Sequence, residues 1–419
     1  MAEVTNYIDR LVAELCPDGV EYRPLGEIAD VTSGYVFPVK YQGNEKSAED
    51  NIPFYKVSDM NLPGNEMFMT SSNNYVSAES AKEMRASLAQ PESIIFPKIG
   101  AAIATNKKRI LTEKSIVDNN VMVVTARSVI NSKFLYYVLT GFDLMSWSMG
   151  AGAVPSIKKS VVVKHEVPVP PLEIQEAIVE ILDKFTNLEA ELEAELEART
   201  LQYEYYRDSL LASFSEPAVK FYPIEKLFTT RNGYTPSKSN SSYWENGTVP
   251  WFRMEDIREN GGVLSEALQS VHESALKKGG MFPAGSIIVA TSATIGEHAL
   301  INVDFLCNQR FTVLTPKEEF KSLLLPKFLY YYSFVLDRWC LANTTQSSFA
   351  SVDMKRFKKF EFPIPPLEEQ QRIVDILDRF DALTSSLSEG LPAELAARRS
   401  QYEYYRDQLL TFPRKGENQ

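Results

Sequence analysis

The hydrophobic pattern is most regular over residues 170–214, where apolar side chains recur every three, four or seven residues. The recurring positions are Ile178, Leu182, Phe185, Leu188, Leu192, Leu196, Tyr203, Tyr206 and Leu210. This spacing is that of one face of an α-helix, and charged residues fill the opposite face. Pro170 and Pro171 stand at the start, where proline is tolerated, and the next proline or glycine is Pro217. The pattern predicts one helix of about forty residues, roughly 60 Å long, with an apolar stripe so narrow that it needs a partner helix.

The partner helix is predicted within the same chain, because the stretch is duplicated. PPLEIQ at 170–175 recurs as PPLEEQ at 365–370, and QYEYYRD occurs at both 202–208 and 401–407. Identity at this level indicates an internal repeat. The second copy is longer and contains Gly-Leu-Pro at 390–392, where we expect a loop or kink, because proline removes a helical hydrogen bond and clashes with the preceding turn.

The duplication extends into the regions before each helix. NIPFYKVSDM (51–60) aligns with TVPWFRMEDI (248–257), SIIF (93–96) with SIIV (286–289), and KFLYY (133–137) with KFLYY (327–331). Short β-rich runs bounded by Gly, Pro and Asn predict strands at 93–96, 121–125, 286–290 and 311–314. Residues 133–147 and 327–341 are predicted helices. The first twenty residues resemble the end of the first long helix, so we expect them beside the C-terminal helix.

These patterns predict an α+β fold. Two similar domains of mixed α and β structure are separated by two long antiparallel helices that form a coiled coil, and the whole is a pseudo-twofold internal repeat. The predicted segments are an N-terminal helical segment that completes the second repeat (1–20), a first globular domain (21–166), a central helix (167–216), a second globular domain (217–361) and a C-terminal helix with its tail (362–419).

Charge is distributed unevenly along this plan. The total of −11 at pH 7 argues at first against a nucleic-acid partner. Residues 21–170 nevertheless carry 16 basic and 15 acidic residues, and 217–366 carry 17 and 14, whereas 171–216 carry 3 and 12. The acidic excess therefore belongs to the helices. Basic clusters at 107–109, 158–159 and 355–359 suit phosphate contact, although a solvated surface is the commoner role of such runs.

Motifs for catalysis, metal binding and membrane insertion are lacking in the sequence. There is no P-loop pattern, and the three histidines and three cysteines are scattered without ligand spacing. Asn51-Ile52-Pro53-Phe54 differs at its second residue from the Asn-Pro-Pro-aromatic motif of amino-methyltransferases. No apolar run approaches 18 residues, and no signal peptide is evident. We therefore expect no catalytic residue, no metal site, no membrane contact and a cytoplasmic location.

Two variable globular units, each followed by a PPLExQxxIVxILD helix, resemble the specificity subunit of type I restriction–modification systems. The resemblance covers essentially the whole chain. It implies two target-recognition domains, each reading half of a split site in double-stranded DNA, and a subunit that is not itself an enzyme. It also implies two methyltransferase subunits docked on the helices and motor–nuclease subunits added for cleavage. S-adenosylmethionine, ATP and Mg²⁺ would then be bound by those partners, and no cofactor by this chain.

Candidate DNA-binding residues come from loops that differ between the two repeats and from the basic clusters. Amides and arginine suit adenine and guanine edges, and lysines suit phosphate. The candidates are Tyr35, Asn106, Lys107, Lys108, Arg109, Asn119, Asn120, Lys158 and Lys159 in the first domain, and Tyr234, Lys238, Thr291, Ser292, Thr294, Asn308, Gln309, Arg310, Lys355 and Arg356 in the second. For each of them a turn or surface role is the alternative. Because the loops differ, we expect a non-palindromic target.

Candidate partner-binding residues come from QYEYYRD. Tyr203 and Tyr206 fit the apolar seam of the first helix, so core packing is their simpler role. Residues off that seam and identical in both copies are candidates for the methyltransferase dock, namely Glu204, Tyr205, Arg207, Glu403, Tyr404 and Arg406. The rival interpretation is a non-enzymatic coiled-coil scaffold with protein-binding globular ends. It would explain the acidic helices but not the more basic domains.

Overall fold

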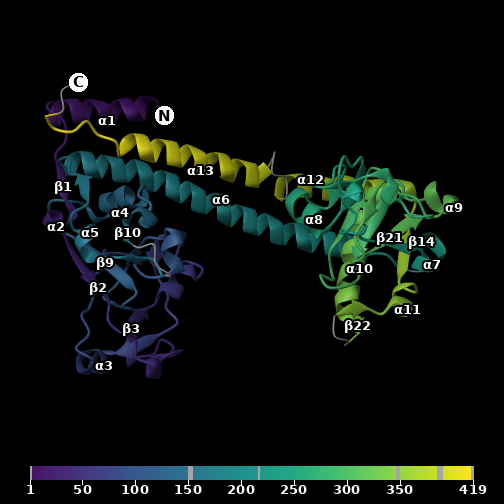
Figure 1. The fold of residues 1–419 in the computed structure, drawn as a ribbon, viewed down its shortest axis with the longest axis horizontal. Coiled ribbons are helices and arrows are strands. Elements are labelled where there is room, and N and C mark those ends of the chain that lie inside the picture. Colours follow the sequence, from purple (N-terminus) through teal and green to yellow (C-terminus); the bar gives the residue numbers. More distant parts are fainter. Residues whose placement is uncertain (1, 150–153, 216–217, 346–349, 385–389, 417–419) are drawn as a thin grey trace. The chain divides into compact units, whose positions relative to one another are not determined.

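The computed structural model describes residues 2–149, 154–215, 218–345, 350–384 and 390–416. Its contacts divide the chain into two compact units (Figure 1). Unit 1 comprises Met1–Ala190 and Ala397–Gln419, and unit 2 comprises Glu191–Ala396. Each unit therefore contains one predicted globular domain together with part of both predicted long helices.

The two units contain the same sheets in the same order. Unit 1 has a five-stranded sheet, β2-β9-β6-β7-β4, and a three-stranded sheet, β5-β3-β8. The strands are β2 (Ala29–Ser33), β3 (Asp50–Tyr55), β4 (Phe68–Met69), β5 (Tyr75–Ser77), β6 (Ile94–Pro97), β7 (Arg109–Leu111), β8 (Ile116–Val117) and β9 (Val121–Ala126). Unit 2 repeats these as β14-β21-β18-β19-β16 and β17-β15-β20. Its strands are β14 (Phe228–Asn232), β15 (Val249–Phe252), β16 (Val263–Leu264), β17 (Ser270–Val271), β18 (Ser286–Ala290), β19 (His298–Ile301), β20 (Leu306–Cys307) and β21 (Phe311–Pro316).

Two-stranded ribbons and short helices complete each unit. In unit 1, β1 (Tyr22–Pro24) pairs with β12 (Glu166–Pro168) and β10 (Ser148–Met149) with β11 (Ser156–Ile157). In unit 2, β13 (Lys220–Pro223) pairs with β24 (Glu361–Ile364) and β22 (Thr344–Thr345) with β23 (Ser351–Val352). The helices are α2 (Leu25–Ile28), α3 (Ala78–Glu83), α4 (Ser132–Thr140) and α5 (Lys159–Val162) in unit 1, and α7 (Ile224–Leu227), α8 (Met254–Asn260), α9 (Glu318–Lys321), α10 (Pro326–Ala342) and α11 (Met354–Phe357) in unit 2.

The central strand of each large sheet is buried on both faces. Ile94 and Phe96 of β6 belong to the hydrophobic cluster that contains α4, whereas Ile95 faces the cluster around Tyr55 of β3. Side chains alternate along a strand, so one short apolar run serves two cores. In unit 2, alternate residues of β18 divide in the same way between the α10 cluster and the β15 cluster.

The predicted helix at 133–147 is shorter in the structure. Helix α4 ends at Thr140, Gly141 is its C-cap, and a separate 3-10 turn covers Leu144–Trp147. Its counterpart α10 continues to Ala342 and confirms the prediction for 327–341. Glycine at 141 favours a helix end more than Val335, which the repeat aligns with it.

The long predicted helix is α6 (Leu172–Ala212), and the second copy forms α12 (Leu367–Thr384) and α13 (Gly390–Leu409). Helix α13 begins at Gly390, whose φ is +78°, and Pro392 falls in its first turn. The second copy is therefore divided close to the predicted position, but residues 390–392 themselves form the first turn of α13, and residues 385–389 lie outside the described ranges. A proline in the first turn costs no hydrogen bond, because those N–H groups have no partner within the helix.

The helices pair inside each unit through duplicated aromatic residues. In unit 1, the ring of Phe185 on α6 lies 6.3 Å from that of Tyr402 and 5.7 Å from that of Tyr405. One turn further along α6, Glu189 accepts a hydrogen bond from Arg399, one turn earlier in α13. The helices are thus antiparallel in unit 1. In unit 2, Phe380 of α12 stacks in the same way on Tyr203 and Tyr206 of α6.

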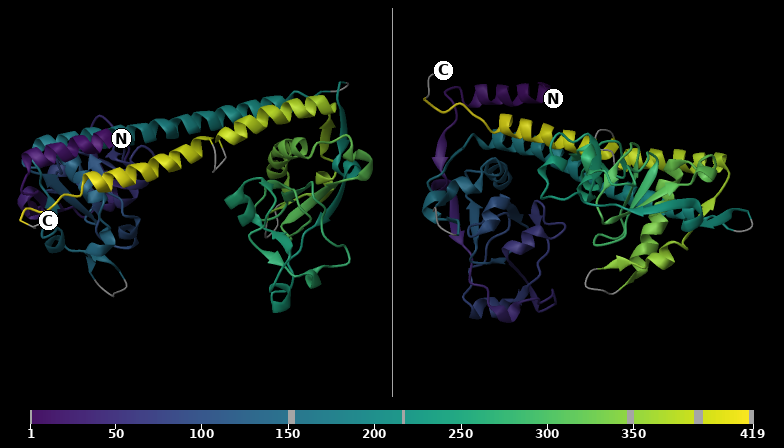
Figure 2. Two further views of the ribbon diagram at one scale, coloured as in Figure 1. Left: turned by 90° about the horizontal axis from the view of Figure 1, so that it is seen from above. Right: turned by 45° about the vertical axis from the view of Figure 1, so that its right-hand side comes forward.

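The N-terminal helix α1 (Ala2–Leu15) packs in unit 1 with the end of the chain. Ile8 is buried in one cluster with Leu409 and Phe412. The Val20 N–H donates to the Pro413 carbonyl (2.8 Å), and α1 lies in the same part of unit 1 as the C-terminal end of α13 (Figure 2). The expected proximity of the two terminal segments is confirmed.

The PPLExQ motif has a structural role that the structure makes explicit. The buried amide of Gln175 accepts a hydrogen bond from the Asn131 N–H (2.7 Å) and donates to the Pro170 carbonyl (2.7 Å). Gln370 does the same with Leu325 (2.9 Å) and Pro365 (2.9 Å). The glutamine therefore attaches the long helix to the helix of the globular domain by satisfying buried backbone groups.

An aspartate two turns further along each helix completes this attachment. Asp183 accepts hydrogen bonds from Lys133 (2.6 Å) and Tyr137 (2.7 Å). Asp378 accepts the equivalent bonds from Lys327 (2.7 Å) and Tyr331 (2.6 Å). Burial, followed by the adjacent carboxylate, raises the pKa of both tyrosines, so their hydroxyls stay protonated donors. We call the glutamine and aspartate contacts the junction frame.

Candidate nucleic-acid and partner-binding surfaces

Three turns meet beyond the end of the large sheet in unit 1. The Lys98 N–H donates to the Asn120 carbonyl (2.9 Å), and the Ile157 N–H donates to the Lys98 carbonyl (2.8 Å). The Tyr35 N–H donates to Val117 (2.7 Å), which brings the segment after β2 to the same place. We call the surface formed by Tyr35, Lys98, Asn119, Asn120, Lys158 and Lys159 the turn face of unit 1.

Unit 2 forms the corresponding surface with the same backbone contacts. The Thr291 N–H donates to the Arg310 carbonyl (3.0 Å), and the Val352 N–H donates to Thr291 (2.9 Å). The Tyr234 N–H donates to the Cys307 carbonyl (2.7 Å). The turn face of unit 2 consists of Tyr234, Thr235, Ser292, Gln309, Arg310, Lys355 and Arg356.

A glycine holds each turn face together. A Cβ on Gly34 would lie 2.1 Å from the Asp118 carbonyl oxygen, and a Cβ on Gly233 would lie 2.1 Å from that of Asn308. Only glycine permits so close an approach of two backbone segments. The Gly-Tyr pair that occurs in both repeats is thus a backbone requirement that places the tyrosine beside the turn.

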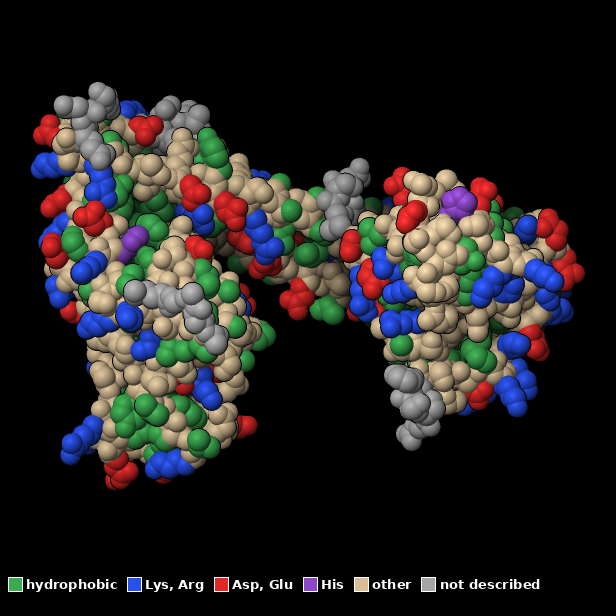
Figure 3. Space-filling view, viewed as in Figure 1, with side chains coloured by type: hydrophobic (Ala, Val, Ile, Leu, Met, Phe, Trp, Pro, Cys, Tyr) green, Lys and Arg blue, Asp and Glu red, His purple; other side chains and the backbone are tan. Residues whose placement is uncertain are grey.

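The exposed side chains differ between the two turn faces. Lys158 and Lys159 are exposed in unit 1, where Asn119 and Asn120 are half-buried. In unit 2, Gln309, Arg310, Lys355 and Arg356 are exposed, and basic side chains gather near α11 (Figure 3). The Asn308 side chain accepts from the Arg310 N–H (2.9 Å) and so shapes the turn. Amide and guanidinium groups can pair with base edges, and the flanking cations suit phosphate.

Tyr234 itself is fixed by two contacts. Its hydroxyl donates to the Ala275 carbonyl (3.0 Å), and the Lys277 ammonium lies 4.1 Å from the ring centroid. Burial raises the pKa of this tyrosine. Its ring thus supports the turn face.

The basic cluster at 107–109 does not form the expected phosphate-binding surface. Lys108 is only 3% exposed, and its ammonium donates to the Asn106 side chain (2.7 Å) and the Phe142 carbonyl (2.5 Å). Burial lowers the pKa of Lys108 to about 8. The expectation that Lys108 contacts DNA is therefore wrong, because its ammonium is buried and hydrogen-bonded inside the protein.

Its neighbours are also engaged within the domain. Arg109 donates to the carbonyls of Lys108 (2.8 Å) and Met60 (3.2 Å), and burial lowers its pKa. Asn106 adopts a left-handed conformation (φ +53°) and accepts from the Leu144 N–H (2.9 Å) as well as from Lys108. Both Arg109 and Asn106 are therefore structural residues, which corrects their prediction as DNA-binding candidates. Lys107 is half-exposed and hydrogen-bonds Asn61.

Two threonine candidates in unit 2 are likewise structural. Thr291 is buried, and its hydroxyl hydrogen-bonds that of Thr312 (2.8 Å). Thr294 is half-buried, and its hydroxyl is buried without a partner. Ser292 stands on the turn face in a bridge with Ser351, and Lys238 is exposed on the segment after Tyr234.

The structure adds basic residues that the sequence analysis did not select. Lys98 aligns with Thr291 in the repeat, lies on the turn face and donates to Ser33 Oγ (2.9 Å). Lys56 and Arg253 occupy equivalent positions, where the N–H of each donates to a buried aspartate, Asp59 or Asp256, at 2.7 Å. The sequence pattern that could have revealed Lys56 and Arg253 is a basic residue three positions before an aspartate, which occurs in both aligned segments, 51–60 and 248–257.

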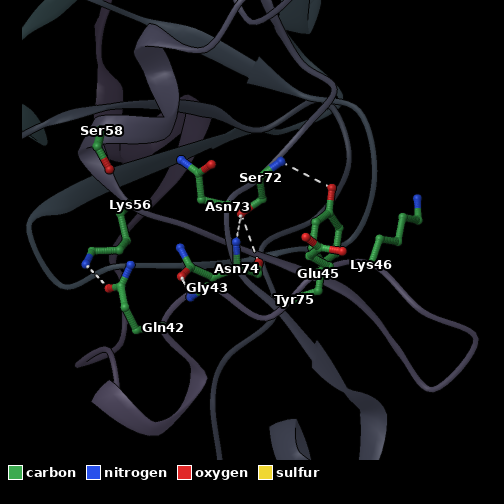
Figure 4. A pocket seen from close by; sticks show the side chains of 10 residues that line it. All are labelled: Gln42, Gly43, Glu45, Lys46, Lys56, Ser58, Ser72, Asn73, Asn74 and Tyr75. Carbon is green, nitrogen blue, oxygen red and sulfur yellow. Dashed lines mark hydrogen bonds between the residues drawn. The ribbon is translucent and has the colours of Figure 1, made fainter.

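Lys56 also lines a polar pocket of about 440 Å³ in unit 1 (Figure 4). Its ammonium donates to Gln42 (2.9 Å). Asn74, which is buried, accepts from the Gly43 N–H (3.0 Å), while its own Nδ2 has no hydrogen-bond partner. The pocket therefore combines the Lys56 ammonium with a polar lining, which suits an acceptor such as a phosphate or a base oxygen.

The QYEYYRD candidates divide into exposed and packed residues. Tyr205 and Tyr404 are 68% and 64% exposed, and Glu204 and Glu403 are exposed beside them. Nearly equal exposure of a large aromatic side chain in both repeats is typical of an interaction surface. We call these two tyrosine–glutamate pairs the tyrosine patches.

The arginines of the motif do not belong to that surface. The side chain of Arg207 is 11% exposed and stacks on Phe334 of α10, 4.3 Å from the ring centroid. Arg406 is 17% exposed and contacts the Tyr402 ring. The expectation that these arginines form part of the dock is corrected, because the Arg207 guanidinium packs against α10 and the Arg406 guanidinium against Tyr402 of its own helix.

Two kinds of site are not found among the described residues. No group of three or more His, Cys, Asp or Glu side chains that could hold a metal ion occurs in the described ranges. Within the same ranges, no helix is long and apolar enough to cross a membrane.

Comparison with known proteins identifies the family. Residues 17–198 and 218–397 match the profile described as the type I restriction modification DNA specificity domain. The chain belongs to the family of type I restriction–modification specificity subunits. The double match to a specificity subunit coincides with the duplicated domains and with the PPLExQ helices that follow them.

Individual relatives agree with this assignment. The specificity subunit of the type I restriction enzyme EcoprrI from Escherichia coli is 55% identical over 201 residues, which cover 46% of this chain and 50% of the relative. That of EcoR124I/EcoR124II, also from Escherichia coli, is 41% identical over 268 residues, or 62% of this chain and 64% of the relative. The matches thus span half to two thirds of those specificity subunits.

A solved structure shows the same fold. A chain from work on complex assembly and conformational transition of the type I R-M system aligns with a TM-score of 0.64 at 17% identity. The alignment covers 94% of this chain and 97% of that chain. At this identity the likeness bears on the fold of the specificity subunit alone.

Proposed function

We propose that this specificity subunit reads DNA for a type I restriction–modification complex, with each unit recognising one half of a bipartite, non-palindromic site. The observation that supports it is the pair of turn faces. Their backbone contacts are the same, including the Gly34 and Gly233 approaches, but their exposed side chains differ. A shared scaffold with different base-facing groups is what two readers of different half-sites require.

The proposal assigns separate roles to residues on each face. Lys158 and Lys159 contact phosphates in unit 1, and Lys355 and Arg356 do so in unit 2. Asn119 and Asn120 read bases in the first half-site, and Gln309 and Arg310 read bases in the second. Arginine favours guanine and amides favour adenine, so the two faces would select different bases.

The partners in this proposal are two methyltransferase subunits, one at each tyrosine patch, and motor–nuclease subunits that join the assembled complex. S-adenosylmethionine, ATP and Mg²⁺ belong to those partners. The specificity subunit performs no catalysis itself. The paired helices set the length of the unspecified gap between the half-sites.

Exchanging residues 21–166 for the matching domain of another specificity subunit tests the proposal. The chimera, expressed with its methyltransferase and motor–nuclease partners, should methylate a motif with one new half-site. The other half-site should stay the same, and so should the gap, because the helices are unchanged. Sequencing of methylated bases in the host genome provides the readout. A change in both half-sites would contradict modular reading, and a changed gap would contradict spacing by the helices.

A further inference from the structure

A pocket of about 510 Å³ lies in unit 2 where α6 meets the recognition domain. Glu204, Arg207 and Asp208 of the QYEYYRD motif line one side, and His298, Tyr330 and Asp337 line the other. We call it the junction pocket. It adjoins the tyrosine patch of this unit through Glu204, which belongs to both.

Two polar atoms in the junction pocket lack partners. His298 Nδ1 lies 2.5 Å from Asp337 Oδ2, and the two residues are 5% and 6% exposed. The imidazole is also held by Phe334, whose ring centroid lies 4.6 Å away. His298 Nε2 and Asp337 Oδ1 are buried and make no hydrogen bond. Buried polar groups normally have partners, so this pair is an incomplete arrangement.

The chemistry of the two free atoms selects the missing group. When the shared proton resides on His298 Nδ1, Nε2 offers a lone pair, and Asp337 Oδ1 is an acceptor. Both therefore accept hydrogen bonds from a donor. The pocket also contains Glu204, while Glu297 pairs with Arg258 (3.2 Å) and both Arg207 and Arg338 are engaged by Asp208. A cation with several N–H donors suits such a site, and the planar guanidinium of arginine supplies two adjacent donors.

Unit 1 shows how the same position is completed internally. Ile95 of β6 pairs with Arg109 of β7, and the aligned Ile288 of β18 pairs with Ala299 of β19. Arg109 and Ala299 are therefore equivalent, and so are the residues just before them, Lys108 and His298. Lys108 is buried near Asp143, the residue that the repeat aligns with Asp337, and its ammonium donates to the Asn106 side chain and the Phe142 carbonyl. Unit 1 thus contains its own cation where unit 2 presents two acceptors.

We propose that the junction pocket of unit 2 receives an arginine side chain of the methyltransferase subunit docked on that unit. The proposal rests on the proposed docking function and adds an anchor that exists in only one of the two units. The two methyltransferase subunits would then bind with unequal affinity, although the tyrosine patches are alike.

The test measures binding of the methyltransferase subunit encoded with this chain to the full-length specificity subunit by calorimetry. Asp337→Asn should weaken one of the two binding steps by roughly tenfold or more and leave the other unchanged. The matched control is Asp143→Asn, at the aligned position in unit 1, which should change neither step by more than about twofold. If both variants weakened binding equally, or Asp337→Asn weakened only DNA binding, the assignment would be overturned.

His298→Lys separates docking from stability. It supplies the internal ammonium that unit 1 already has, so the chain should melt at the same or a higher temperature while the same binding step weakens. A purely structural pair would lose stability and docking together. Unchanged docking in a folded His298→Lys chain would refute the proposal. Failure of the unaltered chain to bind any methyltransferase subunit would instead refute the proposed docking function.

Discussion

The junction frame matches closely between the two units, whereas the turn faces match in backbone contacts but not in exposed side chains. Gln175 and Gln370 make the same backbone hydrogen bonds, and Asp183 and Asp378 accept the same lysine and tyrosine donors within 0.1 Å. On the turn faces the backbone contacts also agree, yet few exposed side chains do. What attaches a domain to its helix is fixed by buried groups that must be satisfied. What faces outward is limited only by what it binds.

The buried residue beside each junction is neither the same in both units, like the junction frame, nor exposed, like the variable side chains of the turn faces. Lys108 and His298 are equivalent in position and both are buried, but one is an ammonium with two internal hydrogen bonds and the other an imidazole with a free nitrogen. A difference inside otherwise matched frames is harder to attribute to chance than a difference on a loop. Three classes of position can therefore be separated: shared attachment contacts, divergent exposed side chains on the turn faces, and a divergent buried residue at the junction.

The largest expected effect comes from breaking the frame itself. Gln370→Ala leaves the Leu325 N–H and the Leu323 and Pro365 carbonyls without partners, which should lower the free energy of unfolding of unit 2 by roughly 4 kcal/mol. Gln175→Ala should do the same to unit 1. Hydrogen exchange in each unit measures the effect. The matched control is Gln371→Ala, because Gln371 is exposed and bonds only to Asp375 on its own helix. Equal effects of the control and the test variants would contradict the role of the frame.

A second prediction uses pH to distinguish the two junctions. Folded unit 1 releases the Lys108 proton near pH 8, whereas an unfolded chain keeps it to about pH 10.4. Between these values the unfolded state binds more protons, so the free energy of unfolding of unit 1 should rise with pH, by up to about 3 kcal/mol. The contribution is absent in unit 2, where His298 occupies the position.

Fluorine NMR of 5-fluorotryptophan can read this out, because Trp147 is in unit 1 and the other three tryptophans are in unit 2. At the Trp147 signal only, the free energy of unfolding of the wild-type chain should rise relative to that of Lys108→Met between pH 8 and pH 10.5. A flat difference would show that the ammonium is not desolvated in the folded state.

Features that depend on local sequence were predicted well. Proline positions and the apolar period defined α6 to within two residues at each end, and Gly390 with Pro392 marked the start of α13. The internal repeat gave the matched sheets, because two copies of one pattern fold alike. The glutamine of PPLExQ was visible as a repeated motif, although nothing in its neighbourhood revealed which backbone groups it satisfies.

Features that depend on distant partners were not predictable in the same way. Lys108 looked like part of an exposed basic run, and its acceptor Phe142 is 34 residues away. Arg207 appeared to lie off the helical seam, and only the fold brings it onto Phe334 of α10. Charge and spacing predict on which face of a helix or in which loop a side chain lies. Whether that side chain is desolvated depends on tertiary packing, which a single sequence does not reveal.

The tyrosine patches allow the comparison to be tested at the surface. Tyr205→Ala and Tyr404→Ala should each weaken one docked methyltransferase subunit by about 2 kcal/mol, because large exposed aromatics anchor interfaces. The double variant should weaken both. Tyr7→Ala, which removes an exposed tyrosine from α1, is the control and should have no effect. If binding titrations found that one of the two tyrosine substitutions leaves methyltransferase affinity unchanged, the two tyrosine patches would not be equivalent docking surfaces.

The smallest expected effect concerns phosphate contacts on the turn faces. Replacing Lys158 and Lys159 with alanine should lower the slope of log affinity against log salt by up to about 2 for the assembled complex on its own site. Replacing Lys355 and Arg356 should do the same, because all four side chains are exposed. Lys108→Met is the matched control: it removes a lysine charge that is buried, so the slope should not move. A slope that falls as far in the control as in the paired variants would mean that net charge, and not the position of the cations on the turn faces, governs DNA binding.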